Sequence, residues 1–374
     1  MVMRIVFWQN CLSPHQVPYI KKLCDDPRVD EVVLVVDELV NDKRMSMGWE
    51  RLSLDDCGVR LFEHPGVEQV ESLLSKSPER SWHLFSGISA FEYVFQVLKR
   101  SLKYNINRGI ITERPYTYAF GCSNGKPLWL HRLRFLIKDL KYARHIGKVF
   151  AMGNSAVDYF ASVYKGWQVL HFAYCTDPYS IEPSSYAGCV RVCFVGSLSL
   201  RKSPVSIVKA VGVLPGNISV SFIGDGVERD TIENQAERLG VNVKVLGFQE
   251  NSKVPSLLSS QDVLILPSVY DGWGAVVNEA LQAGLYVICS DKCGASELLR
   301  DKRLGAVFQE GDSKQLAEKI EFAANCIDEV RADRRYRIDW AKEHISGDVI
   351  AKYMVDCLSG KRTSAPWLEA DANV

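Results

Sequence analysis

The chain has 374 residues, 47% hydrophobic and 24% charged, a length sufficient for two domains and a composition typical of globular proteins. Its 45 basic and 45 acidic residues leave no net charge, which argues against nucleic acid as a partner. No apolar run reaches the roughly 18 to 20 residues that span a bilayer, and the N-terminal residues lack the pattern of a signal peptide. We therefore predict a cytoplasmic protein.

The first half of the chain alternates between strand-like and helix-like segments. Apolar runs predict strands at 4–8, 31–37, 82–85, 108–112 and 148–152, and helical periodicity predicts helices at 14–23 and 90–102. Residues 31–37 are an almost continuous run of valine and leucine, as in a parallel strand covered on both faces. This alternation predicts an α/β domain with a doubly wound parallel sheet over residues 1–180.

A basic segment, residues 96–148, lies within this half and has twelve basic residues and two acids, a net charge of +10. Its part 128–146 combines these charges with Trp129 and other large apolar residues in a helix-like pattern. A basic amphipathic helix is typical of anionic membrane surfaces or of sites for anionic lipid-linked substrates. A solvated helix face explains the same pattern, so both interpretations stay open.

The alternation restarts after a segment rich in turn residues, 175–189, which we predict to be a linker. Strands are predicted at 190–196, 218–223, 243–246, 262–266 and 286–290, and helices at 204–213, 229–239, 254–259, 275–283 and 313–326. A second domain of the same kind is therefore expected over 181–335. Helices at 336–344 and 348–358 follow. We expect residues 336–374 to pack back on the N-terminal domain and to end in a disordered tail, 363–374.

The 11 cysteines are odd in number, scattered, and mostly set in apolar surroundings. This pattern predicts free, buried thiols in a reducing compartment. Cys189 and Cys193, like Cys289 and Cys293, are four residues apart, but neither pair has a nearby histidine. We predict core packing for these pairs and no metal site.

Residues 267–281 hold the most informative motif of the chain. The predicted strand 262–266 leads into a glycine-flanked turn that carries Asp271, and the helix that follows carries Glu279. A strand, a glycine turn and a helix start direct free backbone N–H groups at one spot, which favours an anion. A carboxylate on each side of that spot suits hydroxyl groups, so the motif predicts a ligand with both, such as a nucleotide sugar.

Further glycine turns surround this motif in a fixed order. They are Gly196-Ser197 with Arg201-Lys202, then Gly224-Asp225-Gly226, Gly247-Phe248 and Gly294-Ala295. With these motifs, residues 190–299 resemble the retaining glycosyltransferases of family 4, which have the GT-B fold. The resemblance implies an α/β protein of two Rossmann-like domains, each with a doubly wound parallel sheet, facing a central cleft.

The resemblance also implies transfer of a sugar from a nucleoside-diphosphate sugar to a hydroxyl acceptor, with retention of anomeric configuration and without a metal or other cofactor. The implied mechanism is front-face attack, in which a donor phosphate oxygen takes the acceptor's proton. The resemblance and the basic segment 96–148 together favour a lipid-linked saccharide or polysaccharide precursor as the acceptor, as in lipopolysaccharide assembly. The enzyme would then contact the inner face of the cytoplasmic membrane.

The family pattern places roles on individual residues. Lys202 matches the lysine that neutralises the diphosphate, with backbone N–H groups from Val276 and Val277 beside it. Glu279 matches the acid that binds the ribose hydroxyls, and Asp271 takes the place of a glutamate that faces the transferred sugar.

The other implied donor-site residues shape the backbone or replace family residues. Gly247 and Phe248 match the turn that holds the base. Ser197 stands where the family usually has an arginine, and Arg201 is a candidate to supply that charge. The turn residues that complete the implied donor site are Gly196, Gly224, Gly272, Trp273 and Gly274.

In the first domain three residues need an interpretation. His15 follows Pro14, so it is expected in the first helical turn, facing the cleft. There it either contacts the acceptor or the donor phosphates, or is only a surface residue. Glu113 stands where the family often has a histidine near the reacting carbon, and either replaces it or has no role. His83 lies inside a predicted strand, which favours a structural role.

Two other functions remain as alternatives. A nucleotide-sugar epimerase with the GT-B architecture would turn over donor with no acceptor present. A non-catalytic subunit would bind sugar nucleotide without transfer, and Ser197 and Asp271, which depart from the family pattern, keep this alternative open. A dinucleotide oxidoreductase is disfavoured because no G-x-G-x-x-G opens the first helix.

Overall fold

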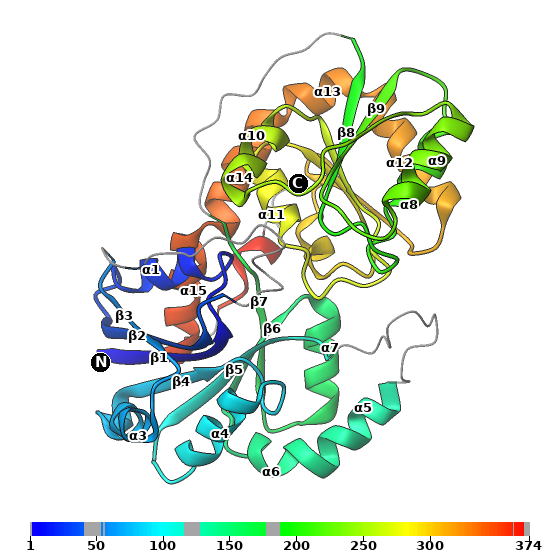
Figure 1. The fold of residues 1–374 in the computed structure, drawn as a ribbon. Coiled ribbons are helices and arrows are strands. Elements are labelled where there is room, and N and C mark those ends of the chain that lie inside the picture. Colours follow the sequence, from blue (N-terminus) through cyan, green and yellow to red (C-terminus); the bar gives the residue numbers. More distant parts are fainter. Residues whose placement is uncertain are drawn as a thin grey trace. The chain divides into compact units, whose positions relative to one another are not determined.

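The computed structural model describes residues 2–40, 54, 57–115, 128–176, 188–361 and 363–369. They form two compact units, each with its own sheet (Figure 1). The first unit holds the described residues up to Cys175 together with Gly347–Pro366, and the second holds Thr176–Ser346 and the described residues from Trp367 onward. Most of the predicted linker, including the 180/181 border, lies outside the described residues.

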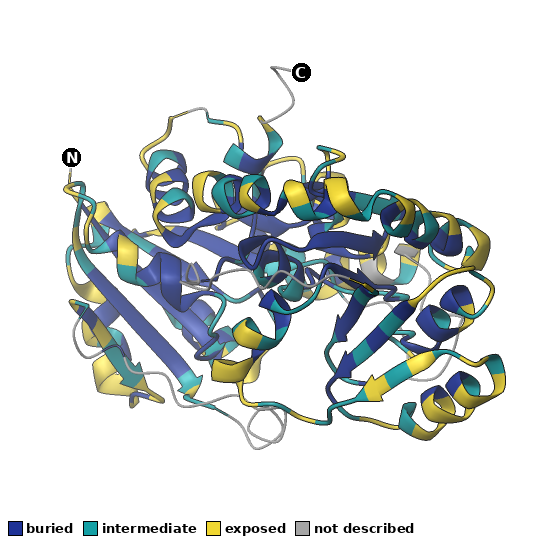
Figure 2. Ribbon diagram, turned by 90° about the horizontal axis from the view of Figure 1, so that it is seen from above, coloured by how far each residue is buried: buried dark blue, intermediate teal, exposed yellow. Residues whose placement is uncertain are grey.

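The sheet of the first unit has seven parallel strands in the order β3-β2-β1-β4-β5-β6-β7. The strands are β1 (Met3–Cys11), β2 (Val29–Glu38), β3 (Val59–Glu63), β4 (Ser81–Phe85), β5 (Asn107–Glu113), β6 (Lys148–Met152) and β7 (Gln168–Phe172). Residues 32–36 of β2 are buried, because helices cover both faces of the sheet (Figure 2). The predicted doubly wound sheet is confirmed.

Short helices connect these strands. They are α1 (Val17–Leu23), α3 (Val67–Ser75), the 3₁₀ turn η1 (Pro78–Arg80), α4 (Glu92–Ser101), α5 (Leu128–Arg134), the π-turn η2 (Phe135–Asp139), α6 (Leu140–Ala143) and α7 (Asn154–Val163). The basic stretch expected as one helix over 128–146 is thus interrupted by η2. None of the helices in the described part of the chain is long and apolar enough to cross a membrane.

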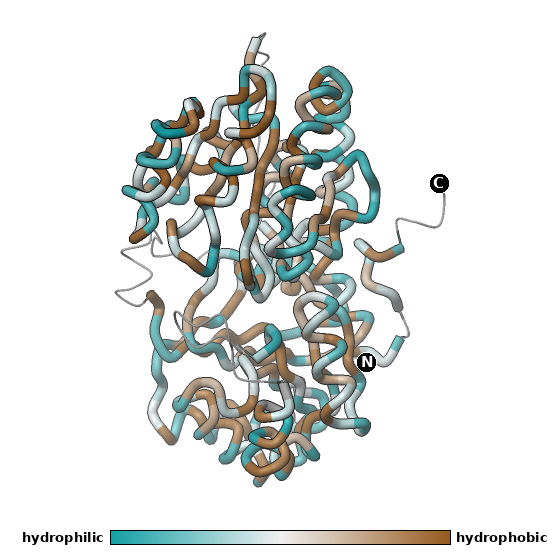
Figure 3. The backbone as a smooth tube through the Cα atoms, turned by 90° about the vertical axis from the view of Figure 1, so that its right-hand side faces the viewer, coloured by the Kyte–Doolittle hydropathy of each residue, from teal (hydrophilic) through white to brown (hydrophobic). Residues whose placement is uncertain are grey.

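The second unit has a six-stranded parallel sheet in the order β10-β9-β8-β11-β12-β13. Its strands are β8 (Val190–Val195), β9 (Ile218–Ile223), β10 (Asn242–Val245), β11 (Val263–Leu266), β12 (Tyr286–Ser290) and β13 (Gly305–Phe308). Its helices are α8 (Val205–Val211), α9 (Arg229–Leu239), α10 (Val254–Ser259), α11 (Val276–Gln282), α12 (Ser313–Asn325), α13 (Ile327–Ala332) and α14 (Arg334–Ile345), with 3₁₀ turns η3 (Asn251–Lys253) and η4 (Gly294–Leu298). Hydrophobic and hydrophilic residues alternate along the coiled segments, as expected of helices with one buried face (Figure 3).

The C-terminal helices divide between the two units. Helix α14 belongs to the second unit, so that unit extends to Ser346 and not to residue 335 as predicted. Helix α15 (Gly347–Leu358) packs beside α1 in the first unit (Figure 1). A Cβ at Gly347 would lie 2.9 Å from the Pro18 backbone, so glycine permits this close approach. The ion pair between Arg28 and Asp356 also joins α15 to the first unit.

The predicted disorder of the tail 363–374 is wrong for residues 363–369, which include the 3₁₀ turn η5 (Pro366–Leu368). The Trp367 side chain is fully buried in the second unit. Its indole Nε1 donates a 2.8 Å hydrogen bond to Oε1 of the buried Glu297. A buried indole with a satisfied N–H explains why this segment is ordered.

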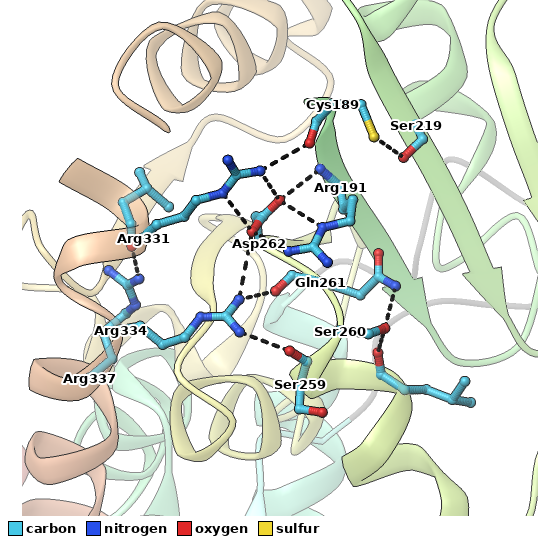
Figure 4. Close-up of polar contacts among 12 residues, drawn as sticks. Cys189, Arg191, Ser219, Ser259, Ser260, Gln261, Asp262, Arg331, Arg334 and Arg337 are labelled. Carbon is cyan, nitrogen blue, oxygen red and sulfur yellow. Dashed lines mark hydrogen bonds and ion pairs between the residues drawn. The ribbon is translucent and has the colours of Figure 1, made fainter. Parts of the chain in front are cut away.

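An ionic cluster lies at the amino end of β11 (Figure 4). The predicted donor site lies at the other end of the strands, beyond their carboxyl ends. Asp262 is buried there, and its carboxylate accepts hydrogen bonds of 2.9–3.2 Å from Arg191 on β8 and Arg331 on α13. Arg334 on α14 lies 3.8 Å away. Burial on its own raises the pKa of Asp262, but the hydrogen bonds from Arg191 and Arg331 outweigh it and hold the pKa below its ordinary value.

Candidate functional site

The candidate site lies at the carboxyl edge of the second sheet, where the strand order reverses between β8 and β11. These two strands pair over only two positions, Val263 with Val192 and Leu264 with Cys193, whereas β8 and β9 pair over six. The ladder between β8 and β11 therefore stops before the carboxyl end of either strand. Ligands of open α/β sheets bind at such a reversal point, beyond the carboxyl ends of the strands.

Lys202 and Asp271 meet across this reversal point. Lys202 comes from the loop between β8 and α8, and Asp271 from the loop between β11 and α11. The Lys202 ammonium Nζ donates to the Asp271 carboxylate Oδ2, and the two side chains are 13% and 12% exposed. A cation is thus held in a sheltered position that an anionic ligand can still reach. The structure brings together these two predicted residues, which are 69 positions apart in the sequence.

Arg201 joins the same two loops through the backbone. Its guanidinium donates a 2.8 Å hydrogen bond to the carbonyl of Tyr270, and its own carbonyl accepts a 2.8 Å bond from the N–H of Val269. Arg201 therefore links the loop that carries Lys202 to the loop that carries Asp271, and its role as an additional positive charge stays a prediction. Ser197, from the same loop as Arg201, has its hydroxyl 3.3 Å from that of Ser199.

The glycine turns bring the loops after β8, β9 and β10 into direct contact. Gly224 has a φ of +139°, and a Cβ there would lie 2.0 Å from the carbonyl oxygen of Gly196. The N–H of Gly224 donates a 2.9 Å hydrogen bond to the carbonyl of Gly247. A side chain at position 224 would push these loops apart. Phe248, next to Gly247, is 52% exposed and presents an aromatic ring at this edge.

The loop that carries Asp271 rests on buried anchors. Trp273 is 1% exposed, and its indole donates a 2.8 Å hydrogen bond to Oδ1 of Asn278. Gly274 has a φ of +90°, and a Cβ there would lie 2.6 Å from the sulfur of Cys293. The Cys293 thiol in turn donates to the Trp273 carbonyl at 2.9 Å. Cys293 supports the turn from the neighbouring strand loop, a role that its spacing from Cys289 did not indicate.

Gly272 also touches that neighbouring loop. A Cβ at Gly294 would lie 2.2 Å from the Gly272 carbonyl oxygen, so glycine is required at position 294 for the two loops to meet. The N–H of Gly294 donates a 3.1 Å hydrogen bond to the Asp271 carbonyl. The backbone of the Asp271 turn is therefore fixed on both sides before any ligand binds.

Helix α11 begins differently from the prediction. The N–H of Val277 donates a 2.9 Å hydrogen bond to the carbonyl of Gly274, so this predicted diphosphate donor is already engaged. Only Val276, of the two predicted N–H groups, stays a candidate. The cause is the tight 3₁₀-type turn at the helix start, which closes on the glycine that precedes it.

Glu279 projects from the first turn of α11, and burial raises its pKa to about 7. A carboxyl group with this pKa is partly protonated near neutral pH, so it changes charge within the physiological range. Hydroxyl groups that donate to it would favour its charged form, because the carboxylate is the stronger acceptor.

The predicted residues of the first unit also lie at a carboxyl edge, that of the seven-stranded sheet. His15 follows β1, but α1 begins only at Val17, so the prediction that His15 lies in the first helical turn is wrong. Its ring lies 5.9 Å from that of Tyr174, whose hydroxyl donates a 3.3 Å hydrogen bond to Oε1 of Glu113 at the end of β5. Tyr174 connects the two predicted residues, although no sequence motif marked it.

Two further predictions concern side chains with no direct part in the site. His83 on β4 is fully buried, and its Nδ1 accepts a 3.0 Å hydrogen bond from the indole of Trp8. This contact accounts for its position in the core. Every cysteine in the described ranges is a free thiol, and no group of three or more metal-ligating side chains gathers among the described residues.

Residues 185–338 match the sequence profile of the family described as Glycosyl transferases group 1. The second unit carries a glycosyl transferases group 1 domain. The family domain spans all the strand loops that form the candidate site, from Gly196 to Gly294. The predicted resemblance to glycosyltransferases is thereby confirmed at the level of this group.

Individual relatives match the same half of the chain. An uncharacterized glycosyltransferase of Methanocaldococcus jannaschii is 30% identical over 172 residues, which cover 44% of this chain and 41% of that protein. The lipopolysaccharide glucosyltransferase WaaG of Escherichia coli is 29% identical over 129 residues, 34% of each chain. The alignments thus span less than half the length of these curated relatives.

Solved structures resemble the whole chain. HepE of Anabaena, solved in complex with UDP and glucose, superposes with a TM-score of 0.69 at 18% identity and covers 96% of this chain and 100% of its own. A crystal structure of WaaG gives a TM-score of 0.61 at 17% identity, covering 95% and 100%. At these identities the likeness shows the fold. The predicted GT-B class, two Rossmann-like parallel-sheet domains, is confirmed.

Proposed function

We propose that the protein is a retaining, metal-independent glycosyltransferase that moves a sugar from a nucleoside diphosphate to a hydroxyl acceptor. The observation that carries this proposal is the Lys202–Asp271 pair. The pair lies at the reversal point of the six-stranded sheet, within the residues that match the glycosyl transferases group 1 profile. Lys202 supplies the charge that a diphosphate needs. Asp271 supplies an acceptor for sugar hydroxyls once the diphosphate takes over the ammonium.

The donor would lie along the loops at this edge. Lys202, with Arg201 beside it, neutralises the diphosphate, and Glu279 accepts hydrogen bonds from the ribose hydroxyls. The base lies against the Gly247 turn, with the exposed ring of Phe248 available for stacking. Because HepE was solved with UDP and glucose, uridine nucleotides are the first donors to test.

In the reaction, the bond between the anomeric carbon and the diphosphate oxygen breaks, and negative charge develops on the leaving diphosphate. Lys202 stabilises that charge, which lowers the barrier. The acceptor oxygen forms the new glycosidic bond on the same face of the sugar, and its proton passes to the departing phosphate oxygen. No group other than the donor is needed to take the proton.

A thermal-shift screen against UDP, GDP and ADP and their sugars tests the proposed donor site. One nucleotide sugar should raise the melting temperature by mass action, and a protein that responds to none of them would contradict the proposal.

The Glu279→Gln variant then tests the ribose assignment. We expect wild-type affinity for that nucleotide sugar to rise about three- to tenfold from pH 6 to pH 8, as Glu279 ionises, and the variant to bind weakly without this rise.

The sign of this pH effect follows from the raised pKa. In the ligand-free native protein Glu279 keeps its proton up to about pH 7, whereas in the unfolded chain it loses the proton near pH 4.3. The contribution of Glu279 to the free energy of unfolding therefore falls as pH rises from about 4.3 to about 7. Donor binding favours the carboxylate and therefore releases the proton. Calorimetric titration measures both the affinity and the proton release, and equal pH slopes in wild type and Glu279→Gln would refute the assignment.

We propose further that the acceptor is a lipid-linked saccharide reached at an anionic membrane. Four large apolar side chains on α5 and η2 are exposed at helical spacing: Trp129, Leu133, Leu136 and Ile137. Exposed bases flank them, namely Arg132, Arg134 and Lys138. An exposed apolar stripe between bases is the pattern of a helix that lies in a membrane interface.

Flotation with anionic liposomes at physiological salt should recover the wild-type protein with the vesicles. Reversal of charge at Arg132, Arg134 and Lys138 should abolish flotation, because each base near the surface is worth about 1 kcal/mol. The matched control reverses three exposed bases of the second unit: Lys253, Lys314 and Arg335. Equal flotation of both triple variants would leave a soluble acceptor as the better explanation.

A further inference from the structure

The first unit contains a cavity of about 290 Å³ at the carboxyl ends of β4 and β5, beneath α5, η2 and α7. Its apolar wall is formed by Ile88, Ile110, Phe135, Tyr159 and Phe160. Gly87 also lines the cavity, and its φ of +86° favours glycine at this turn. This volume is near the lower end of the roughly 300–1,000 Å³ range of ligand pockets, so it suits one small ring.

The π-turn η2 places one aromatic and one acidic side chain, Phe135 and Asp139, at this cavity. In η2 the N–H of Leu140 bonds to the carbonyl of Phe135, five residues back. Phe135 and Asp139, at the two ends of the turn, both line the cavity, while Ile137 between them is 70% exposed to solvent. Single π-turns inside helices are rare and occur frequently at functional sites.

Polar groups form the rest of the lining. The Ser89 hydroxyl donates a 2.6 Å hydrogen bond to Oδ1 of Asp139, which fixes that carboxylate at the cavity wall. Glu113 and Arg134 also line it. Two carboxylates and one guanidinium leave the lining with a net charge of −1, which disfavours a phosphate inside. Carboxylate acceptors opposite aromatic rings suit a neutral ligand with hydroxyl groups on its edge and an apolar face.

We propose that this cavity binds one uncharged sugar ring of the acceptor, with Asp139 accepting hydrogen bonds from its hydroxyls and Phe135 contacting its apolar face. The inference rests on the proposed glycosyltransferase function and assigns recognition of one acceptor sugar to the first unit. Asp139 and Ser89 then determine which hydroxyl pattern is accepted. The cavity lies entirely within the first unit, so it can be tested without the donor.

Saturation-transfer NMR with four methyl α-glycosides, those of glucose, galactose, N-acetylglucosamine and N-acetylgalactosamine, tests the site. At concentrations up to about 20 mM, at least one glycoside should bind the wild-type protein, because affinities near 1 mM are then saturating. Asp139→Asn should bind about tenfold more weakly, through loss of a hydrogen bond to a charged acceptor. Ala90→Phe, which places a ring in the cavity from its exposed rim, should abolish binding.

The matched control is Asp158→Asn, an exposed acid on α7 next to the lining residue Tyr159, which should bind like wild type. Inorganic phosphate should not compete. Binding of no glycoside, equal binding by wild type, Asp139→Asn and Ala90→Phe, or competition by phosphate would overturn the inference. Lys202→Ala should keep glycoside binding, so a failure of the donor site and a failure of this cavity give different results.

Discussion

Lys202→Ala should reduce the rate of sugar transfer by about 10²–10³-fold, the usual effect of removing one preorganised group that stabilises developing charge. Lys202 is held beside Asp271 by the loops after β8 and β11, so its charge needs no rearrangement before the reaction. The loss should fall mainly on turnover, because the charge on the leaving diphosphate is largest in the transition state. Release of nucleoside diphosphate from the nucleotide sugar found by thermal shift measures it.

The control for this prediction is Lys209→Ala, an exposed lysine on the neighbouring helix α8, which should turn over donor like wild type. Lys202→Ala also leaves Asp271 without this ammonium, so its melting temperature is measured in parallel. An unchanged melting temperature with lost turnover supports a role in chemistry. Turnover within threefold of wild type would show that Lys202 does not face the diphosphate and that the donor site lies elsewhere.

Most of the fold was predictable because its strands are long apolar runs with clear turn signals. Eight strands were predicted with the bounds that the structure gives or within one residue at each end: β4, β5, β6, β8, β9, β10, β11 and β12. The missed strands β3, β7 and β13 lie at sheet edges, where half-exposed residues such as those of Gln168–Phe172 break the apolar pattern. Edge strands bury less surface, so hydrophobicity alone marks them weakly.

The candidate site was predictable where a motif encodes the backbone. The glycine turns from Gly196 to Gly294 identified the loops of the candidate site, and the structure shows that the side chains of Lys202 and Asp271 meet there. What the sequence did not indicate depends on tertiary contacts between distant residues. Tyr174 meets Glu113 only because β7 and β5 lie in one sheet, and the bond from Ser89 to Asp139 depends on a π-turn that no residue pattern announces.

The ionic cluster around Asp262 explains how the candidate site keeps its shape. Strands β8 and β11 pair over only two positions, so few ladder bonds hold the two strands that carry the Lys202 and Asp271 loops. At their amino ends, Arg191 on β8 and the residue before β11, Asp262, are joined by both side-chain and backbone hydrogen bonds. Arg331 adds a bond from α13 (Figure 4). The cluster therefore closes one end of a strand pair that is unpaired at the other.

Asp262→Asn should lower the free energy of unfolding of the second unit by about 3–5 kcal/mol, because it removes the buried counter-charge of Arg191 and Arg331 and leaves Arg334 uncompensated. For a unit of this size the melting temperature should fall by roughly 6–20 °C. Because the pKa of Asp262 is held below its ordinary value, its contribution is complete above about pH 4 and is lost as pH falls through the native pKa. Scanning calorimetry between pH 3 and pH 7 measures both effects.

Asp348→Asn is the matched control, since Asp348 forms an ion pair with Lys22 but is 70% exposed. Solvent screens such a pair, so its loss should cost at most about 1 kcal/mol. If the Asp262 variant were no less stable than this control, the cluster would not hold β8 and β11 together. The Asp262 variant could instead be less stable than this control and also bind the nucleotide sugar more weakly at a temperature where it stays folded. That result would show that the ionic cluster at the amino ends of β8 and β11 sets the spacing of Lys202 and Asp271 at the carboxyl ends.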